Sequence, residues 1–131
     1  MNQYLGAITF IVGDYDEAIS WFTSALGFDL VADSDLGDGK RWVLVGPSGS
    51  HAARLLLAKA DGLEQKAAIG KAAGGRVAFF LHTDDFARDL AAMLKRGVKF
   101  REAPRYEAYG TVAVFDDLYG NGWDLIEPRR P

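Results

Sequence analysis

The stretch DYDEAISWFTSALG, residues 14–27, decides the fold. Asp14 followed three residues later by Glu17 is the pattern of a capping box at a helix N-terminus. A glycine such as Gly27 is typical of the position just after a helix. The stretch therefore predicts one amphipathic helix. Its apolar stripe consists of Ile19, Phe22 and Leu26.

A second stretch, DDFARDLAAMLKRG at residues 84–97, runs over the same length from its first aspartate to its glycine. We expect Asp84 to cap this helix and Gly97 to end it. Residues 27–30 also parallel residues 97–100. The repetition predicts a βαβββ unit that occurs twice. The buried stripe of the second helix is expected to be Phe86, Leu90, Met93 and Leu94.

Extended segments rich in β-branched and aromatic residues flank both helices. We expect an α+β fold in one domain, residues 1–131, in which two half-sheets face each other across a cleft suited to small ligands. Module one spans about residues 1–60, a linker with a short helix about 61–75, and module two about 76–131. The expected strands are residues 5–12, 28–32, 42–45, 55–58, 77–81, 98–100, 111–115 and 123–127.

Composition excludes several classes of function. Of 131 residues, 15 are basic and 18 acidic, and the net charge of −3 argues against a nucleic-acid partner. No apolar run approaches about 18 residues, so we expect no membrane span. The N-terminus has no secretory-signal pattern, so we expect a cytoplasmic protein. The lack of cysteine excludes disulfides and thiolate metal sites, and only His51 and His82 offer imidazole ligands.

Three segments resemble the vicinal oxygen chelate superfamily, which includes glyoxalase I, bleomycin-resistance proteins and extradiol dioxygenases. They are residues 12–28, residues 81–100 and the most specific one, FDDLYGNGWDLIE at residues 115–127. The resemblance implies paired βαβββ modules that form a cupped mixed sheet, and by analogy a homodimer. It leaves the chemistry open, because this superfamily supports isomerisation, ring cleavage, ring opening of antibiotics and sequestration.

The resemblance also locates four metal-ligand positions, and most of them have lost their donor. They match Ala7, then Arg54 or Leu56, then Ala78 and Asp124, and only Asp124 is an acid. A divalent cation needs several oxygen or nitrogen donors, so we expect no metal and no other cofactor. The alternative is a relocated metal site, built from His51, His82, Glu102 and Asp124.

Strand alternation then predicts which side chains line the cup. Residues two apart share a face, so the neighbours of Ala7 and Ala78 on their own strands should also face a ligand. Aromatic residues near the rims, Trp42, Tyr106 and Tyr109, offer flat rings to cover it. The predicted ligand-binding residues are Thr9, Ile11, Arg54, Leu56, Phe80, His82, Tyr109 and Asp124.

Two of these residues have candidate chemical roles. Histidine is a common general base, so His82 could act as one oriented by Asp124, or it could be a structural histidine bonded to its neighbours. Arg54 could pair with a carboxylate or phosphate of the ligand, or form an internal ion pair with Asp124.

Three functions remain in competition. The first is metal-independent binding of a small anionic or aromatic molecule, which is either sequestered or transformed by acid–base chemistry at His82. The second is a metal-dependent lyase similar to lactoylglutathione lyase, or a dioxygenase, with displaced ligands. The third is a non-catalytic interaction module whose cup is filled by its own side chains. Whether the protein is an enzyme stays open at this point.

Overall fold

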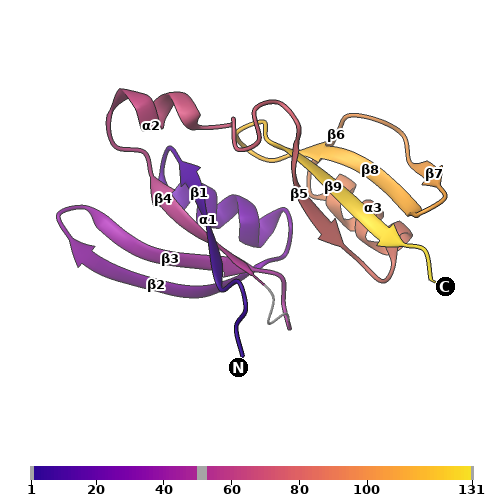
Figure 1. Ribbon diagram of the computed structural model, residues 1–131, viewed down its shortest axis with the longest axis horizontal. Helices are drawn as coiled ribbons and strands as arrows, with labels where there is room; N and C mark the ends of the chain where they lie inside the picture. The colour runs from indigo at the N-terminus through magenta and orange to yellow at the C-terminus, as the bar shows by residue number, and fades with distance from the viewer. Residues whose placement is uncertain (1, 50–52, 131) are drawn as a thin grey trace. The chain divides into compact units, whose positions relative to one another are not determined.

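The computed structural model describes residues 2–49 and 53–130 and divides into two compact units, Met1–Ile69 and Gly70–Pro131. The division falls inside the stretch predicted as the linker, residues 61–75. Each unit contains one mixed sheet with a helix packed against one of its faces (Figure 1). We describe the two units separately, as unit 1 and unit 2.

Unit 1 has a four-stranded sheet in the order β1-β4-β3-β2. Strand β1 runs parallel to β4, whereas β4 with β3 and β3 with β2 are antiparallel. The elements of unit 1 are β1 (Ala7–Val12), α1 (Tyr15–Ser24), β2 (Asp29–Gly37), β3 (Lys40–Gly46), β4 (Arg54–Lys59) and α2 (Gly62–Ala68).

Unit 2 repeats this arrangement, with the order β5-β9-β8-β6 and with β7 also paired to β8. Strand β5 runs parallel to β9, and the other pairs are antiparallel. The predicted α+β fold with two βαβββ modules is thereby confirmed. The elements of unit 2 are β5 (Val77–His82), α3 (Phe86–Lys95), β6 (Lys99–Phe100), β7 (Arg105–Glu107), β8 (Gly110–Asp116) and β9 (Gly122–Pro128).

The helix boundaries follow from capping side chains. The Asp14 carboxylate accepts the backbone N–H of Glu17 at 2.8 Å, as predicted. The second cap was predicted one residue too early, because Asp85, not Asp84, accepts the N–H of Arg88 at 3.0 Å. The Asp84 carboxylate instead forms an ion pair with the Arg88 side chain at 2.9 Å.

Both helices end at the predicted glycines, which have positive φ angles. Gly97 has φ of 86°, and the N–H of Val98 beyond it donates to the carbonyl of Met93 at 3.0 Å. This contact is the closing bond of a Schellman motif. Gly27 has φ of 70° after α1. A left-handed residue costs least when it is glycine, so these positions stop the helices.

The core of each unit lies between its helix and one face of its sheet. In unit 1 the Phe22 ring of α1 contacts Phe10 of β1, with ring centroids 5.3 Å apart. In unit 2 Trp123 of β9 contacts Phe79 and Phe115, with centroids 4.6 and 5.7 Å apart. The prediction for α3 holds for the buried Phe86 and Met93, but it is wrong for Leu94, which is exposed.

The strands differ from the expected ranges mainly at their ends. Strand β2 continues to Gly37, well beyond the predicted end at Ala32. The predicted strands also missed β7, which has only three residues. Among the helices of the described residues, none combines the length and apolar character needed to cross a bilayer.

Candidate functional site

The face of the unit 1 sheet that points away from α1 carries the predicted residues of the first half. Phe10 contacts α1, so alternation places its neighbours Thr9 and Ile11 on the opposite face. We call this the α1-distal face. Register places Thr9, Leu56, Leu44 and Ala32 in one row across its four strands. The row is apolar apart from the Thr9 hydroxyl.

The face of the unit 2 sheet that points away from α3 is more polar. The Glu127 carboxylate on β9 accepts the N–H of Phe86, the first residue of α3, at 2.8 Å. Alternation therefore places Asp124 and Ile126 on the opposite, α3-distal face. One row across it consists of Phe80, Asp124 and Val114, and a second row consists of His82, Ile126, Val112 and Arg105.

Asp124 is a buried carboxylate with an unsatisfied oxygen. The residue is 9% exposed, and its Oδ1 atom has no hydrogen-bond partner in the described part of the chain. Burial raises the pKa of this carboxyl above its ordinary value, Arg105 acts against the rise, and Glu102 adds to it. A buried acceptor without a partner is costly, so such an atom points to a missing ligand or water.

Arg105 and Glu102 form a network beside Asp124. Glu102 lies in the break between β6 and β7, where its carboxylate accepts the Val114 N–H at 2.9 Å and the Arg105 guanidinium at 2.9 Å. The hydrogen bond from Arg105 holds the pKa of Glu102 below its ordinary value. Arg105 also donates to Glu107 at 3.0 Å, and Glu102 and the side chain of Tyr109 help to raise its pKa. Glu102 thus takes the place of a backbone acceptor for the Val114 N–H and fixes the guanidinium.

His82 and Asp124 lie on the same α3-distal face, but they are not directly opposite each other. Register pairs His82 with Ile126, and Asp124 with Phe80. In the described residues no hydrogen bond joins the imidazole to this carboxylate. The role of His82 as a general base oriented by Asp124 therefore stays a prediction.

The sheet registers locate the two family metal positions on β4 and β9. Leu56 lies opposite Thr9 in unit 1, as Asp124 lies opposite Phe80 in unit 2. Leu56 is therefore the internal counterpart of Asp124, and Arg54 lies opposite Ala7. These positions offer methyl groups, a leucine, a guanidinium and one carboxylate, and this donor set does not fit a divalent cation.

The alternative of a relocated metal site has no geometric support within the described residues. No three histidine, aspartate or glutamate side chains in residues 2–49 and 53–130 gather closely enough to hold a metal ion. Of the four residues proposed for it, His51 lies outside the described residues. The absence of a cofactor stays a prediction.

Sequence reasoning missed Arg105 as a site residue. The signal was present in Arg105-Tyr106-Glu107, where charged residues alternate with an aromatic one and so share a face. Glu107 lies on the same face as Arg105, and Tyr106 lies on the other face, toward α3. Tyr106 is therefore misplaced as a ring that covers a ligand beside Asp124.

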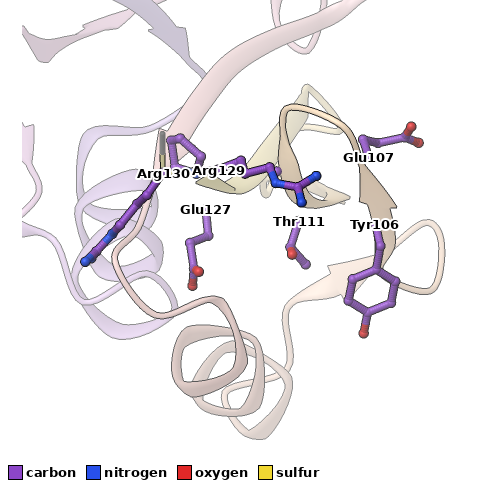
Figure 2. Close-up of a pocket in the computed structure, with 8 residues that line it drawn as sticks. Tyr106, Glu107, Thr111, Glu127, Arg129 and Arg130 are labelled. Atoms are coloured by element: carbon purple, nitrogen blue, oxygen red, sulfur yellow. The ribbon is translucent and has the colours of Figure 1, made fainter.

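A pocket of about 510 Å³ lies on the α3 side of unit 2, at the ends of β8 and β9. Figure 2 shows Tyr106, Thr111 and Glu127 pointing to one side of the sheet, whereas Glu107 points away from them. None of the eight predicted ligand-binding residues lines this pocket. Its lining residues are Tyr106, Glu107, Gly110, Thr111, Glu127, Pro128, Arg129 and Arg130.

Three known proteins show what this chain resembles. An uncharacterized protein of Shewanella frigidimarina is 51% identical over 128 residues, 97% of this chain and 95% of that protein. The crystal structure of UcmS2 is 29% identical with a TM-score of 0.83, covering 97% and 99% of the two chains. TnmS3, an antibiotic-binding protein from Streptomyces sp. CB03234, is 27% identical with a TM-score of 0.76, covering 98% of each.

A family profile gives the broadest comparison. Residues 4–125, nearly the whole chain, match the profile of the Glyoxalase/Bleomycin resistance protein/Dioxygenase superfamily. Helices α1, α2 and α3, all of the sheet of unit 1 and most of the sheet of unit 2 fall within the matched range. The chain belongs to the glyoxalase/bleomycin resistance protein/dioxygenase superfamily.

Proposed function

We propose that this chain binds a small organic molecule on the helix-distal faces of its sheets, without the metal ion of the family's metalloenzymes. One observation carries the proposal: the buried Asp124 has an unpartnered oxygen and lies directly opposite Phe80, which is 61% exposed. Ligand sites combine apolar surface with a few converging polar groups. Phe80 provides apolar surface, and Asp124 provides a polar group.

The apolar row of unit 1 supports an organic ligand with a flat or aliphatic surface. Thr9, Leu56 and Leu44 are neighbours in register on the α1-distal face, and Trp42 on the same face is 44% exposed. Contiguous apolar surface of this kind commonly marks an interaction site. TnmS3 is an antibiotic-binding protein of similar fold, which makes an antibiotic-like molecule a reasonable ligand.

Turnover, if it occurs, would depend on His82. It lies on the α3-distal face in one row with Ile126, Val112 and Arg105, at the C-terminal end of β5. An imidazole can exchange protons near neutral pH. We expect His82→Ala to abolish any turnover and to leave the circular dichroism spectrum unchanged. Undiminished turnover in this variant would remove His82 from the catalytic role.

We also propose a homodimer, by analogy with the family. Among the described strands β1 pairs only with β4, and β5 pairs only with β9, so each has a further edge available for pairing. Sedimentation equilibrium should give a mass twice that of the 14.3 kDa chain. A monomer at micromolar concentration would contradict this part of the proposal.

Two measurements test the proposed binding. Protein purified without chelator should contain only trace nickel, zinc or iron by plasma mass spectrometry, and an aromatic compound library should contain molecules that raise its melting temperature. Thr9→Lys should weaken this stabilisation, because it places a charge in the apolar row. Leu63→Lys is the matched control, since Leu63 lies on α2 and is 88% exposed. Stoichiometric metal, or equal stabilisation of both variants, would contradict the proposal.

A further inference from the structure

The surroundings of Asp124 indicate what kind of ligand atom it receives. Phe80 of β5 lies opposite Asp124 on one side, and Val114 of β8 lies opposite it on the other. Along β9, Gly122 has no side chain, and the Arg101 guanidinium occupies that space, 3.1 Å from where a Cβ atom would be. The carboxylate is thus flanked by an exposed ring, an isopropyl group and a guanidinium.

Both guanidinium groups near Asp124 already have carboxylate partners. Arg101 forms an ion pair with Asp116 at 2.6 Å and donates to the Gly120 carbonyl at 3.2 Å. Arg105 is paired with Glu102 and Glu107, at 2.9 and 3.0 Å. These carboxylates already balance both guanidinium charges, which weakens the attraction of the two arginines for an anionic ligand. Among the described residues, the buried side-chain atom without a hydrogen-bond partner on this face is Asp124 Oδ1. It is an acceptor, so a ligand that satisfies it must offer a donor.

A protonated amine is the donor that best matches this pair of side chains. Hydrogen bonds between two charged groups are about twice as strong as neutral ones. A cation also gains from the face of a neighbouring aromatic ring, which Phe80 offers. An alcohol or amide donor would satisfy the oxygen but would bring no positive charge to the carboxylate.

We propose that Asp124 and Phe80 bind a protonated amino group of the ligand, so that the substrate class of this site is aromatic or aliphatic amines. This inference rests on the proposed function, because it names the ligand of the same α3-distal face. It departs from the anionic ligand expected from Arg54. The Asp124 carboxylate accepts the ammonium hydrogen bond, and the Phe80 ring covers one side of the cation.

Three benzyl compounds of similar size and different charge test the inference. Amide ¹H–¹⁵N spectra of the full chain at pH 7 are titrated with benzylammonium, benzyl alcohol and phenylacetate. Benzylammonium should shift the signals of Phe80, Val114 and Asp124 and bind about tenfold more tightly than the other two probes. Phenylacetate or benzyl alcohol binding as tightly as benzylammonium would overturn the inference.

Matched variants assign the effect to the two side chains. Asp124→Asn should weaken benzylammonium binding about tenfold. Phe80→Leu should weaken it about threefold, because it removes only the ring. Asp84→Asn is the control, since it removes a carboxylate that is 74% exposed and bound to Arg88. Equal affinities of wild type and Asp124→Asn would overturn the inference. Should Asp124→Asn fail to fold, Phe80→Leu and the three probes decide.

The outcomes separate this inference from the proposed function. If phenylacetate or benzyl alcohol shifts the distal-face signals and benzylammonium does not, the assignment of an amine ligand is wrong. The proposal that this face binds a small molecule then still stands. If none of the probes, nor any hit of the compound library, shifts signals on the distal faces, the proposed function fails and the inference fails with it.

Discussion

The two units share their helix-facing cores and differ on their helix-distal faces. Tyr15 and Phe86 begin α1 and α3 as buried aromatic residues, and Phe22 and Met93 occupy equivalent buried positions later in the same helices. On the distal faces, by contrast, Leu56 of unit 1 is replaced by Asp124 in unit 2. The comparison shows that the same apolar pattern on the helix-facing side forms both units. The helix-distal faces of the two sheets can therefore differ in their side chains without changing the fold.

The edge strand beside β3 in unit 1, and its counterpart beside β8 in unit 2, show how this difference arises. In unit 1, β2 is one continuous strand that pairs with β3 along its length, and the register between them shifts at two points. In unit 2 the same place is taken by β6 and β7, which leave a break at residues 101–104. Glu102 enters this break and holds Arg105 beside Asp124. A broken edge strand therefore gives unit 2 polar groups that unit 1 lacks.

The largest expected effect tests the shared cores. Phe22→Ala should lower the free energy of unfolding by about 3–5 kcal/mol, and Met93→Ala by about 2–5 kcal/mol, because each opens a cavity under its helix. Urea denaturation followed by circular dichroism measures both losses. Leu94→Ala is the control, since Leu94 is 53% exposed, and it should cost well under 1 kcal/mol. Equal losses for Met93 and Leu94 would contradict the described core of unit 2.

A hydrogen-bond network in the β8–β9 turn should give the next largest effect. Asp117 is 5% exposed and accepts hydrogen bonds from the side chains of Asn121 and Trp123 at 3.0 and 2.9 Å. Asp117→Ala leaves these donors unpaired and should cost about 2–4 kcal/mol in urea denaturation. Asp116→Ala, which removes a partly exposed ion pair with Arg101, should cost about 1 kcal/mol or less. A smaller loss for Asp117 than for Asp116 would contradict the assignment.

The unpaired carboxylate of unit 2 predicts an unusual dependence of stability on pH. Because burial raises the folded-state pKa of Asp124, its ionised form costs stability at neutral pH, and this cost disappears as the pH falls through the folded-state pKa toward the ordinary value of 3.8. Asp124→Asn should therefore be more stable than wild type at pH 7, by about 1–3 kcal/mol. The difference should shrink toward pH 4.

Urea denaturation of wild type and Asp124→Asn between pH 4 and 8 checks this sign. Leu56→Asn provides the matching change in unit 1. It replaces an apolar residue of the α1-distal face and should lower stability at every pH in this range. An Asp124→Asn variant less stable than wild type at pH 7 would show that the carboxylate has a partner.

The smallest expected effect distinguishes the two adjacent aspartates at α3. Asp14→Ala and Asp85→Ala should each cost about 1 kcal/mol, because each removes a helix N-cap. Asp84→Ala removes only an exposed ion pair and should cost less than about 0.5 kcal/mol. Thermal unfolding of the three variants gives this order. A larger loss at Asp84 than at Asp85 would favour the cap expected from the sequence.

The fold could be predicted from the sequence because its main signals are local. Asp14 marks a helix start through its side-chain cap, and Gly27 and Gly97 mark helix ends through their backbone preference. Alternation assigns residues to faces. The adjacent pair Asp84-Asp85 shows the limit of this kind of prediction. Either aspartate can cap a helix, and the backbone path into α3 decides which one does. Leu94 was misassigned because a helical stripe has ambiguous margins.

The candidate site was predictable only in part, because its geometry depends on pairing between strands. The family resemblance placed Ala78 and Asp124 in the cup, and alternation along β5 then added Phe80 and His82 to the same face. Which residue lies opposite Asp124 required the register of β5 on β9. The break between β6 and β7 contains Pro104, which cannot donate to a strand ladder, so the sequence carries a signal for an interruption. That Glu102 bonds Val114 and Arg105 there required the structure.

Nuclear Overhauser contacts between benzylammonium and the protein test the central claim most directly. The account predicts contacts from the probe to the Phe80 ring and to the Val114 methyl groups, since both lie beside Asp124 on the α3-distal face. Contacts to Tyr106 and Thr111 instead would place the ligand in the pocket of Figure 2, on the α3 side of the sheet, and would contradict the account.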